Sequence, residues 1–227
     1  GSTRVGLITY MRTDSVRISA TALEEVRSWI GEHYQAELPA VPNEYSVEKK
    51  AQDAHEAIRP TYVTYTPEYV KEHLTRDQLR LYSIIWERFV SSQMSNARSR
   101  TSSIDIASGN ALFRVSSTRV FEKGFYKVIK TLVSKDEKEK TLPEMKIGEE
   151  LTVKEFHPEQ HFTQGPARFT DASIVKTLEE KGIGRPSTYA PIISVLLDRY
   201  YVTRSNKQLV PTQLGRIIND LLVGYFP

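Results

Sequence analysis

The sequence predicts an α+β fold in which helical, winged-helix-like domains at both ends are joined by a strand-rich segment. Apolar residues recur at helical spacing near both ends of the 227-residue chain. Between about residues 98 and 154, Ser, Thr, Val, Ile and Phe follow the alternating pattern of strands. A helix, turn, helix and hairpin order closes the sequence. We therefore expect three domains, over residues 3–75, 76–160 and 161–227.

The first domain is expected to contain one strand and two helices. A β-branched apolar run over 5–9 predicts the strand. A helix follows, and Thr21 with Glu24 predicts a capping box at or near its start. The apolar positions of this helix are Ile18, Ala22, Val26, Ile30 and Tyr34. Residues 51–58 predict a second, short helix that Pro60 ends.

The second domain is expected to begin with a helix over about 76–94. Thr75 and Gln78 predict its capping box. Its apolar face is formed by Leu79, Tyr82, Trp86, Phe89 and Val90. Alternating patterns then predict strands over 102–107, 111–121, 125–132 and 150–156, a hairpin turn at 108–110 and a charged loop at 135–140.

The third domain opens with clear start and stop signals. Thr170 caps a predicted helix over 171–181, and Gly182 ends it. After a turn, Ser187 or Thr188 caps a second helix.

The second of these helices is expected to reach about residue 199, with Pro191 tolerated in its first turn. A hairpin over 201–204 and 208–211 follows, and Thr212 opens the last helix. Helix, turn, helix and hairpin form the pattern of a winged helix-turn-helix, a common DNA-binding unit.

Composition and charge limit the kinds of site that this chain can hold. It contains no cysteine, which excludes disulfides and thiolate zinc sites and fits a cytoplasmic location. No apolar run approaches the roughly 20 residues that cross a bilayer. Net charge is only +3, yet eight basic and two acidic residues occupy 95–135, and eight acidic residues follow over 136–160. This distribution fits a nucleic-acid surface or an ordinary solvated one.

Tyr10 directly follows the first predicted strand, with Arg12 and Asp14 beside it. A phenol has an ordinary pKa near 10, so it is a poor nucleophile at neutral pH unless a cation or metal stabilises the phenolate. Arg12 can favour that charge or bind a phosphate, and Asp14 can hold Arg12 in place. A tyrosine at a strand end is also an ordinary packing residue, so both interpretations stay open.

Two further groups of residues can bind phosphate. His55 and Arg59 are four positions apart, so the predicted helix places them on one face. One His and one Glu do not make a metal ligand set. Residues 182–189 end one helix and begin the next, where free N–H groups bind anions. Each pattern also fits an ordinary polar helix end or a simple helix cap.

Five segments form an ordered set: GLITYMRTDS (6–15), AHEAIRP (54–60), LYSIIWERFV (81–90), ARFTDA (167–172) and GIGRPSTYA (182–190). In this order the set closely resembles the bacterial type IA DNA topoisomerases. The first segment resembles the active-site segment of that family, and the next two resemble the motif and the helix that follow it. The last two resemble its later DNA-binding motifs. The resemblance covers nearly the whole chain.

The resemblance implies a role for each matched residue. Tyr10 is expected to attack a single-stranded DNA phosphate and to become linked to the 5′ phosphate of the break, with the support of Arg12. The expected DNA contacts are Asp14, His55, Arg59, Arg168, Arg185, Ser187, Thr188 and Tyr189. The strand-rich middle is expected to belong to an arch through which a second strand passes. The implied activity is ATP-independent relaxation of negative supercoils.

The resemblance also implies a part that this sequence lacks. Intact members begin with a metal-binding (Toprim) domain whose acidic residues bind Mg²⁺, and only nine residues precede Tyr10. We therefore expect a fragment without that domain and without metal ligands of its own. It is expected to bind single-stranded DNA without relaxing supercoils alone, with the missing domain as a further partner. The expected location is the bacterial cytoplasm, at the nucleoid and away from the membrane.

Two other functions compete with this one. A winged-helix module that grips duplex DNA explains the third domain but leaves Tyr10, Arg12 and His55 without a role. A structural protein that only binds a partner explains the strand-rich middle. Sequence-specific duplex binding favours the former, and no DNA binding at low salt favours the latter. Single-strand preference with steep salt dependence favours the topoisomerase resemblance.

Overall fold

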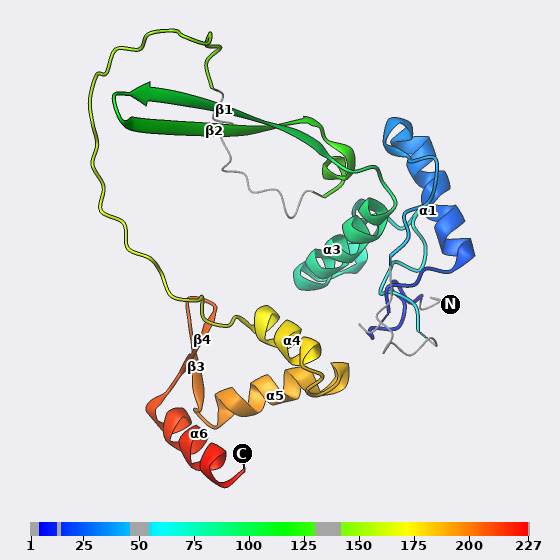
Figure 1. Ribbon diagram of the computed structural model, residues 1–227. Helices are drawn as coiled ribbons and strands as arrows, with labels where there is room; N and C mark the ends of the chain where they lie inside the picture. Colours follow the sequence, from blue (N-terminus) through cyan, green and yellow to red (C-terminus); the bar gives the residue numbers. More distant parts are fainter. Residues whose placement is uncertain (1–4, 13–14, 46–54, 130–141, 227) are drawn as a thin grey trace. The chain divides into compact units, whose positions relative to one another are not determined.

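The computed structural model describes residues 5–12, 15–45, 55–129 and 142–226. In this part of the chain, six α-helices and two small antiparallel sheets confirm the predicted mixture of helices and strands (Figure 1). The chain divides into two compact units, 1–150 and 151–227. The finer division into three domains stays a prediction. Of the described helices, none combines the length and the apolar character that crossing a membrane demands.

Helix α1, Ala20–His33, opens unit 1 and shows the predicted apolar stripe. Ser19 caps it, because the Ser19 hydroxyl accepts a hydrogen bond from the N–H of Ala22 at 3.4 Å. The predicted capping box of Thr21 and Glu24 is wrong. The extended backbone ends at Ser19, so Thr21 already lies inside the helix.

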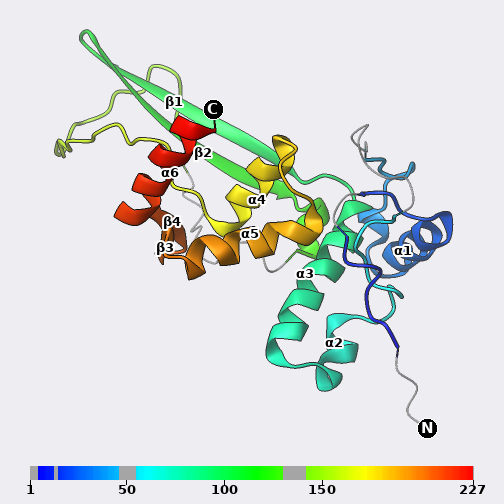
Figure 2. The ribbon, with the colours of Figure 1, turned by 90° about the horizontal axis from the view of Figure 1, so that it is seen from below.

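Helix α3, Arg76–Ser92, has the predicted capping box. The Thr75 hydroxyl accepts a hydrogen bond from the Gln78 N–H at 3.3 Å, and the Thr75 N–H donates to Gln78 Oε1 at 3.0 Å. Helix α2, Pro67–Val70, and the short 3-10 helix η2, Lys71–His73, lead into α3. Figure 2 shows α2 beside α3, where the two helices are in contact.

The core of unit 1 lies between α1 and α3. The rings of Trp29 and Trp86 meet edge to face at 89°, with their centroids 5.1 Å apart. The buried apolar side chains around them are Ala22, Val26, Ile30, Val63, Val70, Tyr82, Phe89, Val90, Met94 and Val128. Burial of each large apolar side chain contributes roughly 1.5–3 kcal/mol. This cluster therefore holds the segments between the two helices as well as the helices themselves.

A long two-stranded hairpin extends from the end of α3. Strands β1, Arg98–Ser108, and β2, Ala111–Glu122, pair antiparallel and join at the predicted turn. Gly109 in that turn has a φ of +56°, which glycine adopts readily. Most residues of both strands are exposed, because no other described element covers either face.

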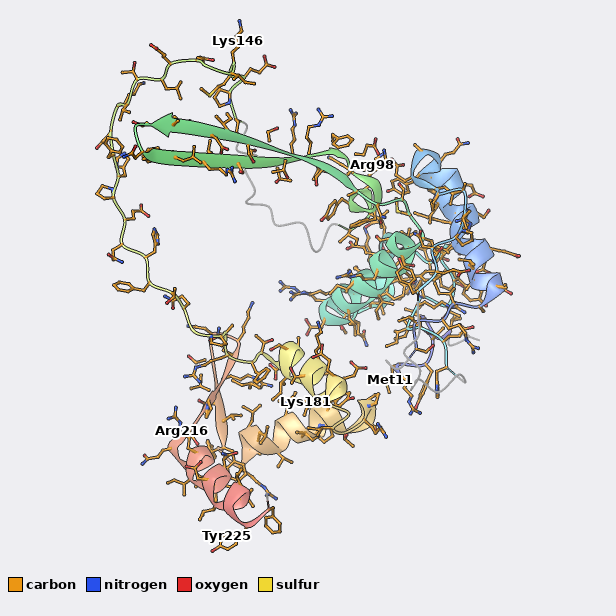
Figure 3. All side chains as sticks on the ribbon, viewed as in Figure 1. Met11, Arg98, Lys146, Lys181, Arg216 and Tyr225 are labelled. Carbon is orange, nitrogen blue, oxygen red and sulfur yellow. The ribbon has the colours of Figure 1, made fainter. Side chains whose placement is uncertain are left out.

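The base of the hairpin is fixed to the helices. The N–H of Phe125 donates to the Ser95 carbonyl at 3.0 Å, and the Ser95 N–H donates to the Glu37 carbonyl at 2.8 Å. Lys127, in the 3-10 helix η3, Gly124–Lys127, forms an ion pair with the Glu37 carboxylate. Arg98 lies at this end of the hairpin (Figure 3). The two ends of the hairpin therefore share one anchor.

Several predicted elements are absent from the described residues. Residues 5–9 form a single β-bridge, Ile8 with Pro60, because the Arg59 N–H donates to the Thr9 hydroxyl instead of continuing the ladder. Residues 55–58 are not helical, and residues 51–54 lie outside the described part. The strand predicted over 125–132 begins instead as η3, and 150–156 is extended without a pairing partner. The charged loop predicted over 135–140 also lies outside the described residues.

Unit 2 begins with helix α4, Asp171–Glu180, which Thr170 caps as predicted. Gly182 follows with a φ of +68° and ends the helix as predicted. Helix α5, Pro186–Asp198, begins one residue before the expected caps, since proline is suited to the first helical position. Ser187 and Thr188 therefore lie inside the first turn. Pro191 falls in the second turn of α5 rather than the first.

The rest of unit 2 follows the predicted order. Strands β3, Val202–Ser205, and β4, Gln208–Pro211, form the hairpin, and Thr212 caps helix α6, Gln213–Tyr225. Arg204 joins β3 to the start of α4 by donating to Asp171 at 2.8 Å. This hydrogen bond, with the positive charge of Arg204, holds the pKa of Asp171 below its ordinary value.

Candidate functional site

Two segments far apart in the sequence lie side by side around Tyr10. The N–H of Thr9 donates to the Arg59 carbonyl at 2.9 Å, and the N–H of Thr61 donates to the Leu7 carbonyl at 3.0 Å. The Thr61 hydroxyl also donates to the Gly6 carbonyl at 2.6 Å. Residues 6–9 are therefore held in place immediately before Tyr10.

Thr9 is the central link between these segments. Its hydroxyl accepts a hydrogen bond from the Arg59 N–H at 3.0 Å and donates to the Ala57 carbonyl at 2.8 Å. With its own N–H bonded to Arg59, Thr9 satisfies three polar groups of the opposite segment. A side-chain hydroxyl is required for two of these bonds, so the residue before Tyr10 is more than a spacer.

Tyr10 presents its ring to solvent beside His55. The side chain of Tyr10 is 66% exposed. Its ring stacks with that of His55 at 27°, with the centroids 5.6 Å apart. The structure therefore brings together two of the residues that the sequence singled out, and it leaves the phenolic end of Tyr10 accessible from outside.

Arg12 continues the same turn. Its N–H donates to the Tyr10 carbonyl at 2.9 Å, and its side chain is half-buried. Asp14, the third residue predicted here, lies outside the described residues. The backbone contact keeps Arg12 within the Tyr10 turn, as a cation that acts on the phenolate requires.

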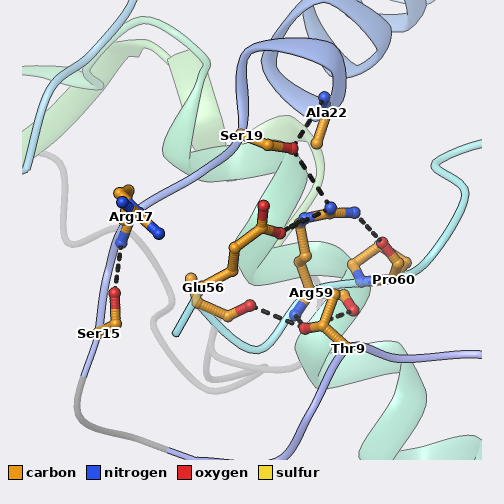
Figure 4. Close-up of polar contacts among 9 residues, drawn as sticks. Thr9, Ser15, Arg17, Ser19, Ala22, Glu56, Arg59 and Pro60 are labelled. Atoms are coloured by element: carbon orange, nitrogen blue, oxygen red, sulfur yellow. Dashed lines mark hydrogen bonds and ion pairs between the residues drawn. The ribbon is translucent and has the colours of Figure 1, made fainter. Parts of the chain in front are cut away.

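Arg59 is held by groups of the protein itself (Figure 4). Its Nε and Nη2 donate to Glu56 Oε2 at 3.1 and 2.8 Å, and its Nη1 donates to the Pro60 carbonyl at 3.1 Å. Nη2 also lies 3.5 Å from the Ser19 hydroxyl, which caps α1. The Arg59 side chain is only 12% exposed. Its guanidinium therefore ties the loop around residues 55–60 to the start of α1.

His55 and Arg59 do not share a helix face, in contrast to the prediction. Residues 55–59 follow an irregular path, because the N–H of Ala57 donates to the Arg17 carbonyl and the N–H of Arg59 donates to Thr9. These bonds replace the contacts that a helix would make within itself. His55 turns to Tyr10, whereas Arg59 turns to Glu56.

The second group of predicted residues lies in unit 2 at the start of α5. Arg185, Ser187 and Thr188 are exposed. The N–H of Arg185 donates to the Thr188 hydroxyl at 2.8 Å, which fixes the first turn. Gly184 has a φ of +77°, and an added Cβ would lie 3.0 Å from the Thr188 hydroxyl. The turn is therefore suited to glycine, and it leaves the three polar side chains on the surface.

Tyr189 differs from its exposed neighbours. Its side chain is only 8% exposed, and Ile193 and Leu209 of the same unit are also buried. In this position its ring supports the turn and has no open face on which a base could stack. Arg168 is exposed just before α4.

Sequence reasoning missed three residues of the site around Tyr10, namely Thr9, Ser19 and Glu56. Glu56 could have been found, because it lies three positions before Arg59 and carries the opposite charge. Thr9 and Ser19 gave no such signal. Their partners lie about 40 to 50 positions away, and only the folded chain brings them together.

The described residues do not fit a metal ion beside Tyr10. In the described ranges, no group of three or more His, Cys, Asp or Glu side chains is placed to hold one. Among the described residues of this site, Glu56 already forms an ion pair with Arg59. Because Mg²⁺ is bound through carboxylate oxygens, this donor set does not suit it.

Comparison with known proteins gives a consistent picture. The family model described as DNA topoisomerase matches residues 3–227. DNA topoisomerase 1 of Treponema pallidum is 62% identical over 226 residues, covering 100% of this chain and 31% of that protein. DNA topoisomerase 1 of Rickettsia bellii is 46% identical over 232 residues, covering 100% and 29%. The chain therefore spans less than a third of the length of either relative.

A solved structure gives the same result for the fold. Full-length topoisomerase I from Thermotoga maritima matches with a TM-score of 0.72 at 34% sequence identity. The match covers 97% of this chain and 35% of that one. The mixed helix and strand fold is thus shared with a solved topoisomerase.

Proposed function

We propose a function for this chain from the premise that it belongs to the DNA topoisomerase family, whose model matches it over residues 3–227. The chain is the part of a bacterial type IA enzyme that carries the nucleophilic tyrosine and grips single-stranded DNA. One observation carries this proposal above others. Tyr10 is exposed, stacked on His55 and anchored through Thr9 to a segment 50 positions away.

Tyr10 acts as the nucleophile that opens one DNA strand. Its phenolic oxygen forms a bond with phosphorus, and the bond from phosphorus to the 3′ oxygen of the neighbouring nucleotide breaks. The proton of the phenol ends on that 3′ oxygen. The 3′ hydroxyl then attacks the phosphotyrosine in the reverse step and reseals the strand. Because one phosphodiester replaces another, neither ATP nor another energy source is consumed.

The residues around Tyr10 support this exchange in different ways. Arg12 stabilises negative charge on the phenolate or on the attacked phosphate, since its guanidinium offers planar hydrogen-bond donors that match phosphate oxygens. His55 holds the tyrosine ring and contacts the DNA beside it. Arg59 acts through Glu56 and the Thr9 hydroxyl, so its part is to position the turn.

Unit 2 supplies a second grip on the strand. Arg185, Ser187 and Thr188 are exposed at the start of α5, where the helix N-terminus favours phosphate. Arg168 adds a positive charge before α4. The order of α4, α5, β3, β4 and α6 supports the proposal that this unit is winged-helix-like. Tyr189 supports the turn from beneath.

The hairpin of unit 1 belongs to the arch in this proposal. Strand passage through the break relaxes negative supercoils, and β1 with β2 forms part of the wall around the passage. In this proposal, the Mg²⁺ of the complete enzyme is bound by a separate acidic domain. This chain alone is expected to bind single-stranded DNA without relaxing supercoils. Its setting is the nucleoid in the bacterial cytoplasm.

Covalent trapping tests the nucleophile directly. The chain is mixed with a 3′-labelled single-stranded oligonucleotide and Mg²⁺, with and without the metal-binding domain of a bacterial relative, and analysed on a denaturing gel. We expect a labelled adduct that needs the added domain and disappears in Tyr10→Phe. Tyr45→Phe is the matched control, because Tyr45 is also exposed, at 52%, and lies in the same unit.

The element order of unit 2 also fits a second function, a winged-helix module that binds duplex DNA. Competition between labelled single-stranded and duplex oligonucleotides separates the two. Tighter binding to one specific duplex, with no adduct at Tyr10, would replace the topoisomerase proposal. Preference for single strands, with an affinity that falls steeply as salt rises, supports it.

A further inference from the structure

Three tyrosine rings form a ladder on the surface of unit 1. The rings of Tyr62 and Tyr65 have centroids 5.1 Å apart at 56°, and those of Tyr65 and Tyr69 have centroids 5.5 Å apart at 19°. Tyr65 is partly buried against the core, whereas Tyr62 is 46% exposed and Tyr69 is 66% exposed. Two aromatic rings therefore stay open to solvent on either side of a third that the core supports.

The backbone beneath the ladder is fixed by two aromatic side chains of α3. Tyr82 donates its hydroxyl to the Tyr65 carbonyl, and Trp86 Nε1 donates to the Val63 carbonyl at 2.9 Å. Thr66 then caps α2 by accepting from the Tyr69 N–H at 3.2 Å. The rings are thus held on a rigid support before any ligand binds. Such preorganisation lowers the entropy cost of binding.

The ladder also continues directly from the Tyr10 turn. Thr61, one residue before Tyr62, is bonded to the carbonyls of Gly6 and Leu7. Tyr10 and Tyr62 therefore lie on either side of the bridge between Ile8 and Pro60. Tyr10 is two positions beyond Ile8, and Tyr62 is two positions beyond Pro60 in the opposite direction, because the two segments are antiparallel. These four positions correspond to about 13 Å at the usual rise of an extended chain. A strand of nucleic acid at Tyr10 can reach this distance within a few nucleotides.

Local charge favours stacking over phosphate binding here. The one lysine of α2 and η2, Lys71, is ion-paired with Glu68. Two carboxylates, Glu68 and Glu72, accompany this lysine, so the surface next to Tyr69 has no net positive charge, unlike the exposed basic start of α5. An aromatic ring without a free cation beside it suits the face of a nucleobase, and a base face is open only when the nucleic acid is unpaired.

We propose that Tyr62, Tyr65 and Tyr69 form a stacking platform for unpaired bases of the DNA strand held at Tyr10. This inference rests on the proposed function, which supplies the strand. The platform adds affinity with little sequence preference, because every base has a face that can stack. It also helps to select single strands, since paired bases bury those faces within the duplex.

The test compares variants of the whole chain on fluorescent single-stranded oligonucleotides by anisotropy. Replacing one stacked aromatic residue by alanine costs about a tenfold loss of affinity. We expect Tyr69→Ala to show this loss and Tyr62→Ala with Tyr69→Ala to show more, while Tyr69→Phe stays within about twofold of the native chain. Tyr45→Ala is the matched control, because it removes another exposed tyrosine ring from the same unit (52% exposed, against 66% for Tyr69).

Two further readouts separate stacking from a general loss of binding. The salt dependence of binding stays unchanged in Tyr69→Ala, because no phosphate contact is removed. In a second experiment, a short block of abasic sites is moved along the oligonucleotide. We expect one position of the block to abolish the difference in affinity between the native chain and Tyr69→Ala, because the bases that stack there are missing. Circular dichroism of each variant confirms that the chain is folded.

The outcomes distinguish this inference from the function on which it rests. If the native chain binds single strands and Tyr62→Ala with Tyr69→Ala binds them equally well, the platform is overturned and the DNA-binding proposal stands. The platform is also overturned if every abasic block leaves the loss in Tyr69→Ala intact. If the native chain binds no single strand, the proposed function itself fails.

Discussion

Thr9 and Arg59 are bonded to each other in both directions. The N–H of Thr9 donates to the Arg59 carbonyl at 2.9 Å, and the N–H of Arg59 donates to the Thr9 hydroxyl at 3.0 Å. The guanidinium of the same arginine reaches Glu56 and Ser19. Thr9 and Arg59, 50 positions apart, thus hold the backbone directly before Tyr10. Thr9 is therefore as important for the position of Tyr10 as the charged residues nearby.

Thr9→Val is expected to loosen the Tyr10 turn. Valine keeps the shape of threonine and the backbone N–H, but it leaves the Ala57 carbonyl and the Arg59 N–H without their hydroxyl partner. The free energy of unfolding should fall by about 1–3 kcal/mol, as for other unsatisfied polar groups. Urea titration followed by tryptophan fluorescence measures it. Thr9→Ser retains the hydroxyl, and an equal loss in that variant would contradict the explanation.

Arg59→Lys is expected to destabilise the fold more than it weakens DNA binding. Lysine cannot make the paired contact with Glu56 or reach Ser19 and Pro60 together. We expect unfolding to become easier by about 1–3 kcal/mol, with an unchanged slope of DNA affinity against salt. A shallower slope, measured by anisotropy at several salt concentrations, would instead show that Arg59 contacts a phosphate.

Stability should depend on Tyr82 at high pH. Burial, and to a smaller extent the neighbouring Tyr65, raises the pKa of Tyr82 to about 12. An unfolded tyrosine has a pKa near 10, so the stabilisation is fully present below pH 10 and is lost as the pH rises toward 12. Between pH 9 and pH 11 the native chain should lose about 1 kcal/mol more than Tyr82→Phe. Equal losses in urea titrations would refute this assignment.

Gly215→Ala is expected to disrupt unit 2. A Cβ at this position would lie 2.0 Å from the carbonyl oxygen of Tyr201, so α6 and the start of the β3 hairpin would have to move apart. We expect a loss of more than about 2 kcal/mol, as for other overpacked sites. Gly224→Ala, in the same helix with nothing within 4 Å, should instead stabilise by about 0.5–1 kcal/mol. Hydrogen exchange of unit 2 measures both effects.

Local signals predicted the starts of α3, α4 and α6, but not those of α1 and α5. The capping box of Thr75 and Gln78, the caps at Thr170 and Thr212, and the turn at Gly109 all depend on residues within a few positions of one another. Strands without near partners were predicted less well. Residues 150–156 alternate like a strand, yet they have no partner in the described part of the chain, and alternation alone cannot supply one.

The candidate site shows the same limit. Tyr10, Arg12 and His55 could be selected from the sequence because their motifs are local. The stacking of Tyr10 on His55 could not, since the prediction placed His55 on a helix with Arg59. The burial of Tyr189 was also missed, because exposure depends on how α5 packs in the folded unit rather than on the motif itself. Whether each residue acts in cleavage stays a prediction.

The common anchor of β1 and β2 gives the hairpin a mechanical property. The strands extend for 11 and 12 residues, which corresponds to an arm of about 36 Å, and both ends are held near Ser95. A force on the turn at Gly109 is therefore delivered as torque to the end of α3, whose core contacts also support Tyr65. The hairpin is therefore positioned to act as a lever on the end of α3.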